Sequence, residues 1–179
     1  WNGQRNSTAM LSSSCVVEGY PALPEGLPAA FKGAMRRLAA SVSIVVAKGE
    51  DGPVGMAATS ITSLTTDPPA VLVCVNRATS LHALLVPTAP LSVNLLSRRQ
   101  QDVSAAFGGG VPRGERFATG EWQTGPDGLP ALVDAQANLR CVIDAMLAYG
   151  THSIVVARVL DVLITGDVDP LIYQDGRYL

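Results

Sequence analysis

Histidine, cysteine and charged residues are scarce in this sequence of 179 residues, in which Asp, Glu, Lys and Arg together make up 16%. The two histidines, His82 and His152, lie far apart, so we expect no histidine-based metal centre and assign no metal. The three cysteines are Cys15, Cys74 and Cys141, and they show no paired spacing. We therefore expect neither a disulfide framework nor a zinc site, and a reducing, cytoplasmic location fits best.

Several motifs and runs are also missing. No apolar run is long enough to cross a bilayer, so we expect no membrane association. A net charge of -2 argues against broad contact with phosphate backbones, so we expect no nucleic-acid partner. The sequence has no glycine fingerprint between a strand and a helix, which excludes a parallel dinucleotide fold. It also lacks the G-x-S-x-G motif of a nucleophile elbow, which argues against a hydrolase.

Hydrophobic residues, by contrast, make up 47% of the chain, enough for one domain with a substantial core. We expect residues 1–27 to form an N-terminal arm or an added segment, and residues 28–179 to form a single domain. A helix is predicted over residues 28–39, because Phe31, Met35 and Leu38 recur at helical spacing.

Runs of β-branched residues bounded by turn residues predict an antiparallel fold. About seven strands with turn signals, short helices and no regular strand–helix alternation favour a barrel or sandwich over a doubly wound sheet. The expected strands cover 42–47, 54–64, 70–75, 91–95, 131–149, 151–165 and 171–173, and the expected short helices cover 80–85 and 97–107.

Two segments carry side chains suited to a ligand. Residues 55–63 combine small side chains with repeated hydroxyls, so a flat ligand could lie against this strand; an ordinary strand with a polar outer face is the alternative. Residues 76–82 leave a strand and enter a helix, where Arg77, Thr79 and Ser80 could hold a phosphate; a plain helix cap is the alternative.

Taken in order along the chain, these stretches resemble the flavin reductase-like domain family, which has an FMN-binding split barrel. Its members serve as reductase partners of two-component flavin-dependent monooxygenases. The block 55–77 is the most specific part of the resemblance, and no single motif decides it. The matching stretches are 31–46, 51–77, 92–97, 101–107, 116–117, 150–154 and 170–178.

The resemblance implies a fold, a reaction and an assembly. The fold is mainly β, an antiparallel split β-barrel with Greek-key-like connections and a few short flanking α-helices. The implied enzyme is a homodimer that transfers hydride from NADH or NADPH to FAD or FMN. It then supplies diffusible reduced flavin to a separate monooxygenase. Hydride transfer of this kind relies on the cofactors' own reactivity, which agrees with the absence of a catalytic triad.

Site residues follow from the resemblance position by position. His152 corresponds to a histidine near the nicotinamide and is the candidate catalytic residue, although a lone histidine at the start of a strand is more often simply hydrogen-bonded or exposed. Ala57 and Ala78 stand where the family often has Thr and Ser, so a hydroxyl contact is missing at each. The cofactor-binding residues are Met56, Ala57, Ala58, Thr59 and Ser60 near the isoalloxazine, Asn76, Arg77, Thr79 and Ser80 near the ribityl chain and phosphate, and Ser97, Gln101 and Phe107 on the phosphate and adenylate side.

Two other functions compete with the reductase. The first is a module that keeps its flavin tightly and acts as an oxidase or electron carrier, without exporting reduced flavin. The second is a barrel that uses its open face only to bind another protein. A tight yellow complex that survives gel filtration would favour the first, and failure to bind any flavin would favour the second.

Overall fold

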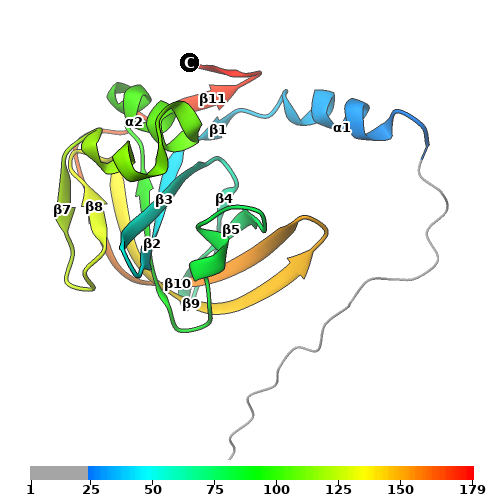
Figure 1. The fold of residues 1–179 in the computed structure, drawn as a ribbon. Coiled ribbons are helices and arrows are strands. Elements are labelled where there is room, and N and C mark those ends of the chain that lie inside the picture. The colour runs from blue at the N-terminus through cyan, green and yellow to red at the C-terminus, as the bar shows by residue number, and fades with distance from the viewer. Residues whose placement is uncertain (1–23) are drawn as a thin grey trace, which may run out of the picture.

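The computed structural model describes residues 24–179, and its main element is a curled antiparallel sheet of seven strands (Figure 1). The order across the sheet is β3-β2-β6-β9-β10-β5-β4. These strands are β2 (Ser43–Gly49), β3 (Gly52–Ala58), β4 (Ile61–Thr66), β5 (Pro69–Asn76), β6 (Pro90–Leu95), β9 (Ala137–Tyr149) and β10 (His152–Ile164).

Short strands and helical segments surround this sheet. β7 and β8 form a two-stranded hairpin, and β1, β11 and β12 form a three-stranded sheet with the C-terminal segment. Their bounds are β1 (Ala40–Ser41), β7 (Trp122–Thr124), β8 (Pro130–Leu132), β11 (Ile172–Gln174) and β12 (Arg177–Tyr178). The helices are α1 (Leu27–Met35) and α2 (Gln101–Ala105), with 3-10 turns at His82–Leu84, Arg98–Gln100 and Arg113–Ala118 and a π-turn at Ala106–Gly110.

The two edge strands of the main sheet, β3 and β4, follow one another in the chain. Only Thr59 and Ser60 separate them, so the sheet must curl until its two edges meet at this corner. Within residues 24–179 no ladder of hydrogen bonds joins β3 to β4, which leaves the barrel split along that line. The expected mainly β, antiparallel split-barrel fold is confirmed.

Several expected boundaries are wrong. The strand expected over 54–64 is two strands, because the chain turns at Thr59 and Ser60 so that β4 can pair with β5. The helix expected over 80–85 is a 3-10 turn of three residues, and that expected over 97–107 divides into 3-10, α and π segments. The N-terminal arm expected over 1–27 lies largely outside the described residues, which begin at 24.

Both faces of β2 are buried, and each contributes to a different core cluster. Val45 and Ala47 face the inside of the barrel with residues of β5, β9 and β10. Ile44 and Val46 face the opposite side, where α2, the π-turn and β8 cover them. A strand covered on both faces needs a continuous apolar run, which explains why this segment shows no polar alternation.

A cluster of three aromatic rings closes the second core against β3. The ring of Phe107 lies 5.0 Å from that of Phe117 and 5.4 Å from that of Trp122, centroid to centroid. Phe107 also packs on Gly55, where an added Cβ would lie 2.6 Å from its ring. The nearby Arg116 guanidinium donates a 3.0 Å hydrogen bond to the Gly55 carbonyl. Glycine is therefore required at position 55 by close packing.

We expect Gly55→Ala to destabilise the protein by about 1–3 kcal/mol, because the new methyl group overlaps a ring that its neighbours hold in place. The melting temperature, measured by calorimetry, should fall by roughly 3–10 °C. Gly33→Ala is the matched control, since nothing lies within 4 Å of the added Cβ and alanine favours the helix. Equal melting temperatures for wild type and Gly55→Ala would contradict this packing.

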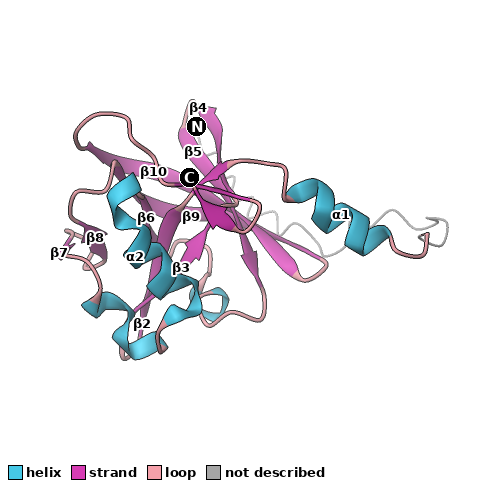
Figure 2. Cartoon of the chain, turned by 90° about the horizontal axis from the view of Figure 1, so that it is seen from above, coloured by secondary structure: helices cyan, strands magenta, loops and turns pink. Residues whose placement is uncertain are grey.

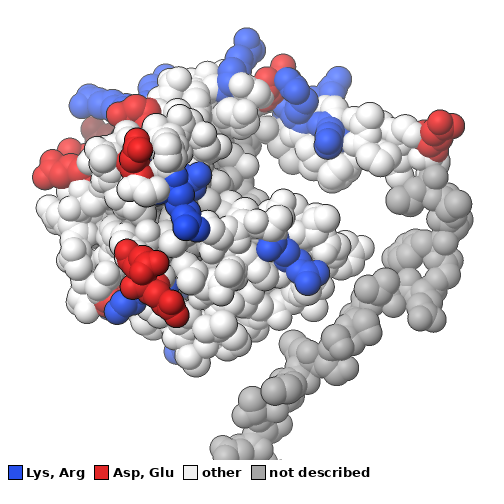
Figure 3. All heavy atoms as spheres, viewed as in Figure 1, with Lys and Arg blue, Asp and Glu red and all other residues white. Residues whose placement is uncertain are grey.

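Helix α1 extends sideways from the barrel and buries none of its residues (Figure 2). Its end is held by an ion pair of 2.7 Å between Arg36 and Asp175, next to β11. The apolar side chains of Phe31 and Met35 remain 60% and 43% exposed. Cations gather near the same helix (Figure 3).

None of the helices in the described part of the chain is long and apolar enough to span a membrane.

Candidate active site

The corner where the barrel is split brings together two of the segments predicted to bind a cofactor. Ser60 is attached to β5 by two hydrogen bonds: its hydroxyl donates to the Cys74 carbonyl at 2.8 Å, and its carbonyl accepts from the Cys74 amide at 3.1 Å. Asn76 ends β5 two residues later and pairs in register with His152 of β10. The segments at 58–60, at 76–77 and at 152 therefore share one end of the barrel.

A cavity of about 280 Å³ opens beside the end of β3. Ala57, Ala58 and Thr59 line one side, and their small side chains leave the backbone accessible. The other walls are residues that sequence reasoning missed. Ser104, in α2, and Tyr178, in β12, share a hydrogen bond of 2.9 Å between their hydroxyls. The remaining lining residues are Val42, Ala105, Gly108 and Tyr173.

A second cavity, of about 630 Å³, lies at the end of β5 and is lined by Asn76, Arg77, Ala78, His82, Gly150 and Thr151. The Arg77 amide donates to the Thr151 carbonyl at 2.9 Å, and the Arg77 guanidinium lies 3.4 Å from the Gly150 carbonyl. Arg77 has no carboxylate partner among the described residues, so its charge is available to an anion. Arginine binds the oxygens of a phosphate with short, often paired, charge-assisted hydrogen bonds.

The turn after Asn76 is closed by its own hydrogen bonds. The Asn76 side-chain oxygen accepts from the Ala78 amide at 2.9 Å, and the Thr79 hydroxyl donates to the Asn76 carbonyl at 2.7 Å. The turn thus keeps its shape without a hydroxyl at position 78, where the family often has one. Ser80 is exposed and does not cap a helix, because the 3-10 turn begins after Leu81.

His152 is exposed at the start of β10, and its Nδ1 lies 2.9 Å from the Thr151 hydroxyl. This contact orients the ring and leaves Nε2 available to a ligand. Met56 is half-buried in β3 and packs against the interior core.

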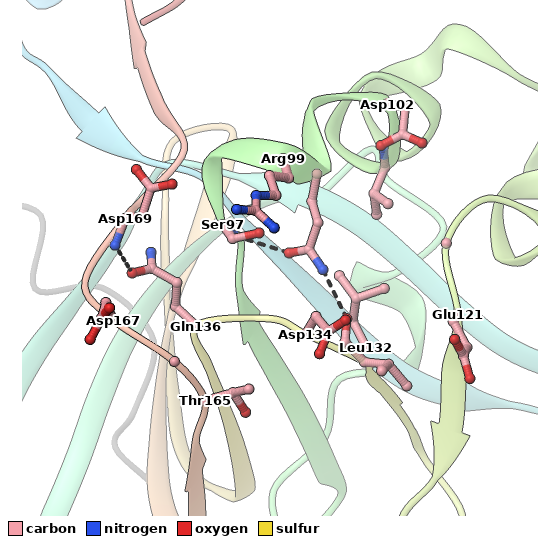
Figure 4. Close-up of a pocket in the computed structure, with 15 residues that line it drawn as sticks. Ser97, Arg99, Asp102, Glu121, Leu132, Asp134, Gln136, Thr165, Asp167 and Asp169 are labelled. Atoms are coloured by element: carbon pink, nitrogen blue, oxygen red, sulfur yellow. Dashed lines mark hydrogen bonds between the residues drawn. The ribbon is translucent and has the colours of Figure 1, made fainter.

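The three residues assigned to the phosphate and adenylate side are dispersed. Ser97 lines a separate cavity of about 700 Å³, where its amide donates to the Gln100 side chain at 3.0 Å (Figure 4). Gln101 is exposed at the start of α2. Phe107 is 2% exposed as a whole residue and packs in the second core cluster, so it presents no free surface to a cofactor. The structure does not bring these residues to the Arg77 cavity.

The cavity beside Ser97 is strongly acidic. Its walls carry one arginine, Arg99, against five carboxylates, which would repel a phosphate. The five carboxylates of this cavity are those of Asp102, Glu121, Asp134, Asp167 and Asp169.

Within residues 24–179, no group of three or more His, Cys, Asp or Glu side chains is placed to hold a metal ion.

Cys141 is not placed for nucleophilic chemistry. Burial raises the pKa of Cys141 to about 12, so its thiol stays protonated inside the barrel.

The candidate site at the end of the barrel offers small side chains, backbone groups, hydroxyls, one arginine without a carboxylate partner among the described residues and one exposed histidine. Such a site can bind and orient a flat, phosphate-bearing cofactor, and the fold and site together define the protein as a split-barrel cofactor-binding enzyme.

Comparison with known proteins specifies this class further. The family model described as flavin reductase like domain matches residues 35–179, and the chain belongs to this family. The resemblance noted from the sequence and the oxidoreductase activity that it implied are confirmed, as is the use of a flavin and a reduced pyridine nucleotide.

Curated relatives and solved structures carry related names. The chain is 39% identical over 149 residues to "FMN reductase (NADH) RutF" of Pseudomonas syringae pv. syringae, covering 83% of this chain and 84% of that protein. It is 37% identical over 157 residues to the reductase component of a FADH(2)-dependent resorcinol hydroxylase of Rhizobium sp., covering 87% and 88%. The structure of BorF, the flavin reductase component of a bacterial two-component tryptophan halogenase, superimposes with a TM-score of 0.77 at 30% identity, covering 85% and 96%.

Proposed function

We propose that this protein oxidises NADH, reduces FMN and releases the reduced flavin to a separate flavin-dependent monooxygenase. The observation that carries the proposal is the cavity beside Ala57, Ala58 and Thr59, together with a second cavity at the same end of the barrel that contains Arg77, which has no carboxylate partner among the described residues. The names of the relatives support both the donor and the role of a partner, since one is an NADH-dependent FMN reductase and others are reductase components of a hydroxylase and a halogenase.

The residues at the split corner fit a flavin. Ala57 and Ala58 present small side chains against which a flat ring can lie, and the backbone and hydroxyl of Thr59 in the same cavity can hydrogen-bond a heteroaromatic edge. The Ser60 hydroxyl, which donates to Cys74, could still accept a hydrogen bond from it. We assign Arg77 to the phosphate, as the charge that holds it in place. We assign to the ribityl chain and the phosphate, together with Arg77, the residues Asn76, Thr79 and Ser80.

Bound flavin and reduced pyridine nucleotide supply the hydride chemistry themselves. The protein has to bind both, hold them in contact and exclude water from between them. We assign His152 to orienting the nicotinamide, because its ring lies at the open end of β10, beside Asn76 in the adjacent strand. Donors at residues 58–60 stabilise the negative charge that develops on the flavin edge.

We favour FMN over FAD on electrostatic grounds. The cavity of about 700 Å³ beside Ser97 is lined by five carboxylates, of which Asp169 is paired with Arg98, and it remains an unfavourable environment for the second phosphate of FAD. Ser97, Gln101 and Phe107 would then play no part in binding an adenylate. NADH is favoured over NADPH because FMN reductases that are 39% and 40% identical to this chain bear NADH in their names.

Turnover with added flavin tests the proposal. NADH or NADPH oxidation is followed by the loss of its absorbance, in air, with FMN, FAD or riboflavin added in turn. Oxidation that depends on added flavin and is fastest with NADH and FMN is expected. A flavin that stays bound through gel filtration and is not exchanged would instead indicate an oxidase or electron carrier. No binding of any flavin would point to a protein-interaction barrel.

We also propose that the protein is a homodimer, with the domain at residues 28–179 as its subunit and the reducing cytoplasm as its location. Large apolar side chains are exposed on α1 and at the end of β10, with Phe31 at 60% and Ile164 at 75%, and a second subunit could cover them. Cys74 and Cys141 are both unpaired, as expected in a reducing compartment.

Light scattering coupled to gel filtration should give twice the mass of the chain at micromolar concentration. Replacing Phe31 and Ile164 together by serine removes apolar area from both exposed patches and should shift the protein toward the monomer. A variant with two exposed polar residues replaced, Glu50→Ser with Asp51→Ser, is the control. A wild-type protein that is monomeric at these concentrations would contradict the dimer.

A further inference from the structure

One of the two histidines forms a contact that none of the assignments above uses. Nε2 of His82 lies 2.9 Å from the hydroxyl of Ser153, at the second position of β10. Ser153 is 3% exposed and faces the barrel interior with Val155 in the same strand. His152, one residue earlier, points to the opposite face because side chains alternate along a strand.

His82 also closes the turn that carries Arg77. Its amide donates to the carbonyl of Thr79 at 3.1 Å and lies 3.3 Å from the Thr79 hydroxyl, which in turn is bonded to Asn76. The turn is therefore attached to the barrel at three places. These are the end of β5, the Arg77 amide bonded to Thr151, and the His82 ring bonded to Ser153.

The contact between His82 and Ser153 is not easily replaced. Ser153 Oγ has no other partner among the described residues, and a buried hydroxyl left without one costs free energy. Leu81, the residue before His82, is 1% exposed and packs in the interior core, so this end of the turn is also anchored by burial. The turn is thus fixed before any ligand binds, and a fixed turn loses less entropy when it closes on a phosphate.

We propose that His82 is a positioning residue for the flavin phosphate. Through its hydrogen bond to Ser153 it holds the turn 76–80 in the conformation that presents Arg77, Thr79 and Ser80 to the phosphate. This inference rests on the proposed function and adds to it a residue that the phosphate itself need not touch.

The comparison of FMN with riboflavin tests the proposal, because the two ligands differ only by the phosphate. Dissociation constants of both are measured by quenching of flavin fluorescence, for wild type, His82→Ala, His82→Gln and Ser153→Ala. His82→Ala should weaken FMN binding about tenfold, the effect of one well-placed hydrogen bond, and leave riboflavin binding unchanged. At saturating FMN, kcat should stay near that of wild type while KM for FMN rises.

Two further variants separate positioning from a general loss of stability. The amide of His82→Gln can still bond the Ser153 hydroxyl, so it should recover most of the FMN affinity. Ser92→Ala is the control for Ser153→Ala, since Ser92 is also buried in a strand and bonded, here to the Pro130 carbonyl at 3.0 Å. Ser92→Ala should leave the ratio of FMN affinity to riboflavin affinity unchanged, whereas Ser153→Ala should lower this ratio.

Equal losses of FMN and riboflavin affinity in His82→Ala and Ser153→Ala, or no loss at all, would overturn the inference while leaving the reductase function standing. If His82→Ala does not fold, Ser153→Ala and His82→Gln carry the same comparison. A wild-type protein that binds neither FMN nor riboflavin would overturn the proposed function itself, and the inference with it.

Discussion

Replacement of His152 by alanine is expected to lower kcat/KM for NADH by about ten- to a hundredfold, with KM for FMN little changed. The ring is exposed, is oriented by Thr151 and lies at the end of the barrel that we assign to the nicotinamide. Loss of an orienting contact reduces the fraction of bound donor that is correctly placed for hydride transfer. Steady-state kinetics with NADH varied at saturating FMN measures the effect.

Stability provides the control for this variant. An exposed side chain outside the core should change the free energy of unfolding by no more than about 0.5 kcal/mol, so the melting temperature should stay at the wild-type value. His152→Gln, which retains a hydrogen-bonding group, should fall between wild type and alanine. Unchanged kinetics in His152→Ala would remove His152 from the site.

Replacing Arg77 by alanine should weaken FMN binding by about 10–100-fold, the range expected when charge-assisted hydrogen bonds to an anion are lost. Riboflavin, which carries no phosphate, should bind as well to the variant as to wild type. The prediction depends on two observations: Arg77 has no carboxylate partner among residues 24–179, and it lines the cavity at the end of β5. Fluorescence titration with each flavin measures both constants.

Arg98→Ala is the matched control, since Arg98 is a similarly exposed arginine that pairs with Asp169 at 3.0 Å away from the Arg77 cavity. Its FMN affinity should equal that of wild type. If Arg77→Ala and Arg98→Ala behaved alike, a general effect of surface charge would account for the result, and Arg77 would not be the phosphate ligand.

The sequence predicted most strands of the main sheet, because turn residues such as those after β2 and before β5 bound the β-branched runs. It did not predict the corner between β3 and β4. Residues 55–63 contain no proline, and their only glycine is the first residue, so no local signal marks a break. The corner depends instead on the bonds between Ser60 and Cys74, which are distant in sequence and form only when β4 pairs with β5.

The site was predicted only in part, because some of its contacts join residues that are distant in sequence. Arg77 and His152 were identified from short stretches, and the pairing of β5 with β10 brings those stretches together. Ser104 and Tyr178 were missed because they reach the cavity from α2 and from the C-terminal strand β12, and their hydrogen bond is invisible in sequence. The resemblance covered both stretches without assigning either residue a role.

Helix α1 shows where periodicity is informative and where it is not. The spacing of Phe31, Met35 and Leu38 predicted a helix over 28–39; the helix forms over Leu27–Met35, so the predicted end is wrong and Leu38 lies beyond it. The spacing could not indicate what the apolar face of the helix contacts, and within the described chain that face contacts no core. The fold of one chain leaves this face exposed, which is why the oligomeric state has to be measured.

A crystal structure of the protein with FMN bound tests the central claim most directly. We predict the isoalloxazine against residues 57–60 at the split corner and the phosphate within hydrogen-bonding distance of the Arg77 side chain. A flavin bound in the acidic cavity beside Ser97, or one whose phosphate is held by residues other than the turn 76–80, would contradict it.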